Sequence, residues 1–290
     1  MPFWELTVPA SAEVSEGLTN FLWEQGALGV VEEERPGEPA RLRAFFPEST
    51  PSTRLVEAAR RYVASLRALG FTADGSDPLL TPRLEEPWAE AWRQAFVPQR
   101  VGRRLLIAPP WEVPAPEDGR TTVIIEPGRA FGTGTHGSTQ GCLVLLEALL
   151  AREAVAEALD VGTGSGILAI AAAALGVGRV TALDTDPDAV AAARTNAARN
   201  GVAGRIECLT ADPRDWAGLA APLIVSNLLA GTHVRLAPDY RRLLARGGHL
   251  ILGGLLPEEA ASIPAALGPH GFTSAEHADV EGWVSLLLRG

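Results

Sequence analysis

The fold of this chain is decided by the stretch Ala158-Leu-Asp-Val-Gly-Thr-Gly-Ser-Gly-Ile-Leu-Ala-Ile170. An apolar run ends at Asp160, a turn with glycine at 162, 164 and 166 follows, and an alanine-rich helical pattern begins directly after it. Glycines at this spacing let the backbone turn sharply and approach a ligand, towards which the new helix directs its first N–H groups. The stretch therefore predicts a strand, a tight turn and a helix around a ligand site.

A second strand, Val180–Asp184, ends in a carboxylate. In an open parallel sheet, an acid at that place accepts hydrogen bonds from the ribose hydroxyls of a bound nucleoside. Dinucleotide-binding turns carry their third glycine one residue further along, where this chain has Ile167. The spacing favours a nucleoside cofactor without phosphates, such as S-adenosylmethionine.

Another apolar run, Leu223–Leu229, predicts a strand that closes on Asn227, whose amide would lie at the edge where parallel sheets bind ligands. Strand and helix patterns alternate around these motifs, which predicts an α/β doubly wound sheet. Trp216 and Trp283 are interpreted as core residues. Further strands are expected at 104–108, 121–125, 205–209, 248–255, 272–278 and 282–288, and helices at 142–150, 187–200, 232–244 and 257–267.

A second glycine-rich loop reads Glu126-Pro-Gly-Arg-Ala-Phe-Gly-Thr-Gly-Thr-His136. Such a loop is either a flexible hairpin or a lid over a ligand. Phe131 and His136 favour the lid, because a purely mechanical loop needs neither residue. An isolated histidine beside glycines would also cap the following helix. No second histidine or acid has metal-ligand spacing from His136, so we expect no metal site.

The N-terminal part shows strand, helix, strand, strand, helix and strand patterns, with the fourth strand from Phe71 onward. This order predicts a small ferredoxin-like α+β domain. Because it holds no catalytic constellation, we interpret residues 1–77 as a substrate-recognition domain; a stabilising appendage is the alternative. Residues 78–97 are predicted to be a linker and an amphipathic helix carrying Trp88, Trp92 and Phe96, and residues 98–290 the second domain.

The composition narrows the function classes. The net charge of -10 argues against a protein that binds nucleic acid through its phosphates and suits a basic partner. All 25 cations are arginine, so Schiff-base chemistry on a lysine is excluded. The two cysteines lack metal-ligand spacing and are expected to be buried thiols. Without a membrane-length apolar run or a secretion signal, we expect a cytoplasmic protein, monomeric by default.

With these motifs the chain resembles the PrmA family, the methyltransferases of ribosomal large-subunit protein eleven. The resemblance rests on the loop at 126–136, the turn at 160–166, Leu183-Asp-Thr-Asp-Pro187 and Asn227-Leu-Leu-Ala230, and it covers nearly the whole chain. Three residues depart from the family pattern. Glu126 stands where aspartate is usual, Gly137 where proline is common, and Ser138 where the first of two threonines stands.

The resemblance implies a class I methyltransferase domain with a seven-stranded doubly wound sheet, preceded by the ferredoxin-like domain. It implies S-adenosylmethionine as methyl donor, S-adenosylhomocysteine as product, and lysine side chains and the N-terminal amine of ribosomal protein eleven as acceptors. The family's cofactor positions correspond to Thr139, Gly162, Asp184 and Asn227, and the spacing of the turn adds Gly164.

Methyl transfer from a sulfonium needs a neutral amine held in line, and a free lysine amine has a pKa of about 10.4. We expect the Asn227 amide to aim that amine and Phe131 to wall the methyl group. His136 is the candidate base. Three alternatives remain: an N-methyltransferase of another protein or a small amine, a non-enzymatic cofactor-binding module of ribosome assembly, and, most distantly, an NAD-dependent dehydrogenase.

Overall fold

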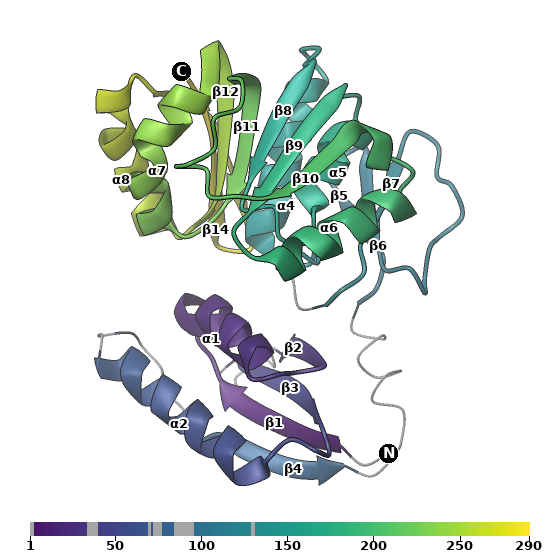
Figure 1. Cartoon of the computed structure of the whole chain (residues 1–290), viewed down its shortest axis with the longest axis vertical. Helices are drawn as coiled ribbons and strands as arrows, with labels where there is room; N and C mark the ends of the chain where they lie inside the picture. The colour runs from purple at the N-terminus through teal and green to yellow at the C-terminus, as the bar shows by residue number, and fades with distance from the viewer. Residues whose placement is uncertain (1–2, 34–39, 69–70, 72–76, 84–95, 129–130) are drawn as a thin grey trace. The chain divides into compact units, whose positions relative to one another are not determined.

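The computed structural model describes residues 3–33, 40–68, 71, 77–83, 96–128 and 131–290. The chain divides into two compact units, Met1–Ala95 and Phe96–Gly290. Figure 1 shows the elements of both units with their labels.

The described part of the N-terminal unit is one antiparallel sheet with two helices. The strands lie in the order β2-β3-β1-β4, and each neighbouring pair is antiparallel. This arrangement is ferredoxin-like, as predicted. Its elements are β1 (Phe3–Pro9), α1 (Ala12–Glu24), β2 (Gly29–Glu33), β3 (Arg41–Pro47), α2 (Ser52–Ala68) and β4 (Leu79–Arg83).

Strand alternation separates the two faces of this sheet. Leu6 and Val8 of β1 are buried with apolar residues of α1 and α2, including Leu18 and Leu55. Glu5, which precedes Leu6 in β1, accepts two hydrogen bonds of 3.0 Å from the Arg43 guanidinium of β3. That pairing raises the pKa of Arg43.

The predicted linker over 78–97 begins too early. Leu79–Arg83 pairs with β1 as strand β4, and Pro82 stands opposite Trp4. An edge strand tolerates proline because one side of its backbone needs no partner. The proline-rich composition was therefore interpreted as a linker although part of it forms a strand. The fourth strand is therefore β4 rather than a strand starting at Phe71. The helix expected around Trp88 and Trp92 falls outside the described residues.

The C-terminal unit carries the seven-stranded sheet, in the order β10-β9-β8-β11-β12-β14-β13. Strands β10 to β12 are parallel, and β14 runs antiparallel to both of its neighbours. The expected fold class is thereby confirmed. The elements are β5 (Gln99–Val101), β6 (Leu105–Ala108), β7 (Thr121–Ile124), α4 (Gly137–Leu150), β8 (Glu157–Val161), α5 (Ile167–Ala174), β9 (Arg179–Asp184), α6 (Pro187–Arg199), η1 (Ala203–Arg205), β10 (Ile206–Thr210), β11 (Ala221–Asn227), α7 (Ala230–Leu243), β12 (Leu244–Leu255), α8 (Pro257–Leu267), η2 (Gly268–His270), β13 (Thr273–Val280) and β14 (Trp283–Arg289).

Helices cover both faces of this sheet (Figure 1). Apolar residues of α4, α5 and α6 pack with one set of alternating strand residues, and those of α7 and α8 pack with the other set. The strand order reverses between β8 and β11, which are direct neighbours. In such sheets a ligand binds at the carboxyl ends of the strands beside this switch point. The topology thus points to the ends of β8 and β11.

Three short strands, β5, β6 and β7, form a separate small sheet. The sequence patterns predicted β6 and β7 but not β5, which is only three residues long. Glu147 of α4, 7% exposed, holds the β5–β6 turn. Its carboxylate accepts the backbone N–H groups of Arg103 and Arg104 at 2.9–3.1 Å. Helix α4 itself begins at Gly137, five residues earlier than predicted.

Cys142 and Cys208 are both buried free thiols, as predicted. No helix in the described part of the chain is long and apolar enough to cross a membrane. The same described residues contain no group of three or more His, Cys, Asp or Glu placed to hold a metal ion.

We predict that Glu147→Gln destabilises the C-terminal unit by about 2 kcal/mol. The amide keeps one acceptor but turns an N–H group towards backbone donors, and hydrogen bonds to a charged group contribute roughly 1.5–3 kcal/mol. Urea unfolding followed by circular dichroism measures the effect. Glu157→Gln, at an exposed position of β8, is the matched control; equal midpoints for the two variants would contradict the assignment.

Candidate functional site

Two predicted site residues, Asp184 and Asn227, and Asp160 of the glycine-turn motif come from strand ends of the seven-stranded sheet. Asp160 lies near the end of β8, Asp184 ends β9, and Asn227 ends β11. The glycine turn joins β8 to α5, and its Gly164 N–H donates to Asp184 Oδ2 at 2.9 Å. The fold therefore brings the turn and both later strand ends to one edge of the sheet.

Asp160 shapes the turn from inside. It is fully buried, and its Oδ2 accepts the Thr163 hydroxyl at 2.7 Å and the Ala169 N–H at 3.1 Å. Its Oδ1 is buried without a hydrogen-bond partner. Burial raises the pKa of Asp160 to about 7, against the opposing effect of these donors. A buried acceptor without a donor is costly, so Oδ1 is a candidate acceptor for a ligand donor.

The N–H groups of the turn itself are engaged within the protein. Gly162 and Thr163 donate to the Leu183 carbonyl, Gly164 to Asp184, Ser165 to the Phe131 carbonyl and Gly166 to the Thr163 carbonyl. The Ala169 N–H in the first turn of α5 is engaged by Asp160. The expectation that the first N–H groups of the helix point at a ligand is therefore wrong for Ala169, and the turn, whose own N–H groups are engaged within the protein, offers side-chain acceptors.

Gly162 and Gly164 have φ angles of +74° and +53°, which favour glycine. Their close neighbours also leave no room for a side chain. A Cβ on Gly162 would lie 2.6 Å from the Leu228 side chain, and one on Gly164 would lie 2.5 Å from the Phe131 carbonyl oxygen. Since Leu228 follows β11 and Phe131 belongs to the glycine-rich loop, these contacts pack both segments onto the turn. A cofactor contact at either glycine stays a prediction.

Asp184 is held in place by two backbone donors. Besides Gly164, the Asp186 N–H donates to its Oδ1 at 3.0 Å. Asp212 lies two residues after the end of β10 and was missed, although Cys208-Leu-Thr-Ala-Asp212 resembles the apolar-then-acid pattern of β9. Arg214 donates to both Asp212 oxygens, which lowers the pKa of that carboxyl group. A second carboxylate thus stands one strand away from Asp184.

Asn227 connects β11 to the start of α4. Its Nδ2 donates to Ser138 Oγ at 3.1 Å and to Thr139 Oγ1 at 3.2 Å, which brings the predicted residues Thr139 and Asn227 together. Its Oδ1 is buried without a partner and lies against Gly253 and Gly254. Asn227 is therefore the second site residue with an acceptor oxygen that lacks a donor.

Phe131 and His136 face one another across the glycine-rich loop, with ring centroids 5.8 Å apart in an edge-to-face arrangement. His136 also packs on Trp283, 4.6 Å between centroids, and its Nδ1 lies 2.8 Å from Ser138 Oγ. Trp283 is buried as predicted, but its contact with His136 was not foreseen. Burial lowers the pKa of His136 to about 4, which makes the imidazole a weak proton acceptor and weighs against the base role.

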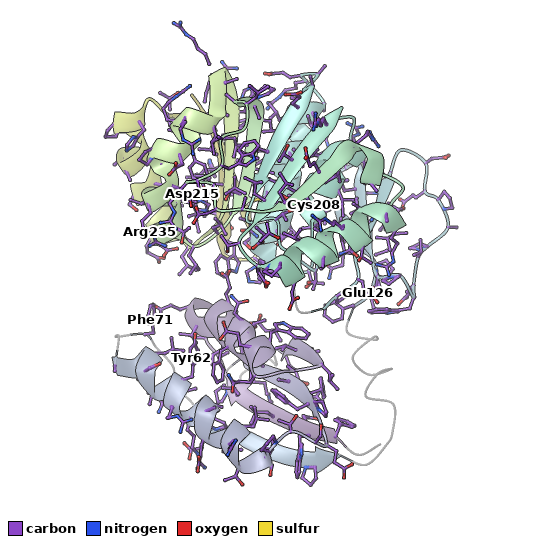
Figure 2. The ribbon with its side chains drawn as sticks, viewed as in Figure 1. Tyr62, Phe71, Glu126, Cys208, Asp215 and Arg235 are labelled. Carbon is purple, nitrogen blue, oxygen red and sulfur yellow. The ribbon has the colours of Figure 1, made fainter. Side chains whose placement is uncertain are left out.

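The departure at Gly137 has a visible cause. A Cβ at this position would lie 2.5 Å from the Val280 carbonyl oxygen and 3.1 Å from the Trp283 ring. Glycine therefore lets the start of α4 pack directly on the β13–β14 turn. Glu126, labelled in Figure 2, departs from the family pattern without strain, since it accepts a hydrogen bond of 2.7 Å from Arg199.

A buried polar chain lies beneath Asn227 and joins four elements. Ser226 Oγ donates to the Val161 carbonyl at 2.9 Å and lies 3.1 Å from Tyr240 Oη. His233 Nδ1 lies 2.9 Å from Tyr240 Oη, and its Nε2 lies 2.8 Å from the Gly253 carbonyl oxygen. The three side chains are fully buried, and burial lowers the pKa of His233 to about 4. The sequence offered no signal for this chain, because its members are far apart in sequence.

Comparison with known proteins identifies the family of the chain. The family model described as "Ribosomal protein L11 methyltransferase (PrmA)" matches residues 2–290. The chain belongs to this family.

Curated members of the PrmA family cover most of the chain. The ribosomal protein L11 methyltransferase of Symbiobacterium thermophilum is 42% identical over 87% of this chain and 82% of its own length. That of Pelotomaculum thermopropionicum is 36% identical over 100% of this chain and 99% of its own length. The solved structure of the ribosomal protein L11 methylase from Lactobacillus delbrueckii subsp. bulgaricus has a TM-score of 0.61 and 31% identity, covering 67% of this chain and 98% of that one.

We predict that His233 makes this PrmA-family chain less stable as the pH falls from about 6.5 to 4. In this window the unfolded state binds a proton on His233 that the folded state excludes, so the free energy of unfolding falls with falling pH, by at most about 1.4 kcal/mol per unit. His233→Gln removes this contribution.

Urea unfolding of both proteins at pH 7 and pH 4.5 tests the prediction. The pKa of His136 is also lowered and that of Asp160 is raised. Both residues remain in the variant, so only the difference in unfolding free energy between the two proteins is informative. If the wild type exceeds the variant in unfolding free energy by the same amount at both pH values, His233 is not the source of the pH dependence.

Proposed function

We propose that this protein transfers methyl groups from S-adenosylmethionine to amines of ribosomal protein L11, namely lysine side chains and the N-terminal amine. The proposal rests on the family to which the chain belongs and on the names of its curated relatives. The net charge of -10 suits a basic protein substrate. We further propose that the N-terminal unit recognises this substrate, that no nucleic acid is required, and that the protein acts as a cytoplasmic monomer.

The observation that carries the cofactor assignment is the pair of buried oxygens without donors, Asp160 Oδ1 and Asn227 Oδ1, beside the glycine turn. S-adenosylmethionine carries an ammonium group and two ribose hydroxyls, so it offers the hydrogen-bond donors that these residues lack. The acceptor oxygens of the protein therefore fit the donors of S-adenosylmethionine. In this arrangement Asp184 would hold the ribose, and Gly162, Gly164 and Thr139 would lie around the cofactor. When bound, the cofactor supplies a sulfonium methyl group.

The protein's own contribution is to position and desolvate the acceptor amine. The lone pair must be free and aligned with the methyl group, and no covalent enzyme intermediate is needed. An amide oxygen has two lone pairs, so in our proposal Asn227 Oδ1 also accepts an N–H of the amine and orients it. The Phe131 ring, with His136 behind it, walls the site against water. With a pKa of about 4, His136 stays neutral and adds no repelling charge near the amine.

Intact-mass spectrometry of purified L11, incubated with this protein and S-adenosylmethionine, tests the function. We expect mass increases in steps of one methyl group, which peptide mapping assigns to amines. Because the enzyme contains no lysine, methyl-lysine in the mixture comes only from the substrate. Bound S-adenosylhomocysteine with no change in L11 would rule out the substrate, and absence of binding would rule out the cofactor.

We predict that Asp184→Asn lowers the affinity for S-adenosylhomocysteine at least about tenfold. The amide keeps only one acceptor for the two backbone donors and the ribose, and the loss of a charged acceptor corresponds to roughly 1.4 kcal/mol or more. Isothermal titration calorimetry measures the affinity. The exposed Asp215→Asn (Figure 2) is the charge-matched control; equal loss in both variants would point to net charge instead.

A further inference from the structure

The glycine-rich loop rests on the glycine turn through its backbone. The Ser165 N–H donates to the Phe131 carbonyl at 2.8 Å, and the Ser165 hydroxyl donates to the Gly132 carbonyl at 2.5 Å. Neither contact leaves room for larger groups: a Cβ on Gly164 would collide with the Phe131 carbonyl, and one on Gly132 would lie 2.9 Å from Ser165 Oγ. The middle of the loop is therefore fitted to one residue of the turn.

Asn196 of α6 fastens the same residue from the other side. Its Nδ2 donates to the Ser165 carbonyl at 2.9 Å, and its Oδ1 accepts the Glu126 N–H at 3.2 Å. Ser165 and Asn196 are each 2% exposed, so water does not compete for these bonds. Together they tie the beginning of the loop, the middle of the loop and the turn into one hydrogen-bonded unit.

The neighbouring residues of the turn serve the cofactor in the proposed function. Gly164, next to Ser165, donates to Asp184, and Thr163 donates to Asp160. A ligand that tightens this turn also tightens the carbonyl contacts at Ser165, because adjacent residues of a closed turn do not move independently. By linkage, order in the loop then favours the ligand to the same degree.

We propose that Ser165 and Asn196 are positioning residues that couple the glycine-rich loop at 131–136 to occupancy of the cofactor turn. This inference rests on the proposed function, since it names the regulation of the same site. Cofactor binding then strengthens the contacts that already hold the loop on the turn, and it keeps Phe131 and His136 in the places seen here.

Hydrogen exchange of loop peptides, with and without S-adenosylhomocysteine, tests the coupling directly. In the wild type we expect the ligand to slow exchange across 131–136. In Ser165→Ala, we expect exchange in the free protein to rise about fivefold, ligand protection to shrink, and affinity for S-adenosylhomocysteine by calorimetry to fall about fivefold. Ser165→Thr, which keeps the hydroxyl, should restore part of both effects, and kcat for methyl transfer should fall more than the KM for L11 rises.

Two further variants keep the test decisive. Ser262→Ala removes an exposed hydroxyl that also donates to a backbone carbonyl, and it should leave every readout unchanged. Gly132→Ala disturbs the same contact from the loop side and also strains the backbone, because Gly132 has a φ of +98°. Its effect and that of Ser165→Ala should be less than additive in the double variant, because both remove one interaction.

The outcomes separate the inference from the proposed function. If the wild type binds S-adenosylhomocysteine but its loop exchange does not respond, or if Ser165→Ala matches the wild type, the coupling is wrong and the function stands. If the wild type does not bind S-adenosylhomocysteine, the proposed function and the coupling both fall.

Discussion

The site depends on one buried carboxylate. Asp160 bends the chain after β8 by accepting the Thr163 hydroxyl and the Ala169 N–H with a single oxygen. That oxygen fixes both the turn and the start of α5, and the turn in turn sets where Asp184 and Phe131 lie. Keeping this carboxyl group in the interior costs solvation, as its raised pKa indicates. Its second oxygen, Oδ1, is buried without a hydrogen-bond partner.

The glycine turn also has a different role from the one that its composition suggests. Glycine-rich turns are commonly explained by close approach of a ligand to the backbone. Here the closest approaches to Gly162 and Gly164 are made by the protein itself, through Leu228 and the Phe131 carbonyl. The turn is a junction on which the segment after β11 and the glycine-rich loop are both seated.

The sequence predicted what local patterns encode. The turn at 160–166, the acid ending β9 and the amide ending β11 all follow from residues that are neighbours in the chain, and the structure places each at the same edge of the sheet. The prediction from composition was wrong at Leu79–Arg83, which was interpreted as a linker and is an edge strand. Prolines are compatible with both kinds of segment. The contacts of Ser165 and Asn196 were not predictable, because their partners lie 31 to 70 positions away.

The buried chain beneath Asn227 has a consequence in its count of protons. Four contacts run from the Val161 carbonyl through Ser226, Tyr240 and His233 to the Gly253 carbonyl, and both ends accept only. With His233 neutral, the three side chains carry three protons for four contacts. Ser226 and His233 must each give theirs to a carbonyl, so the one Tyr240 proton serves either Ser226 Oγ or His233 Nδ1. Of the two contacts of Tyr240 Oη, one is therefore a hydrogen bond and the other is a contact between two acceptors.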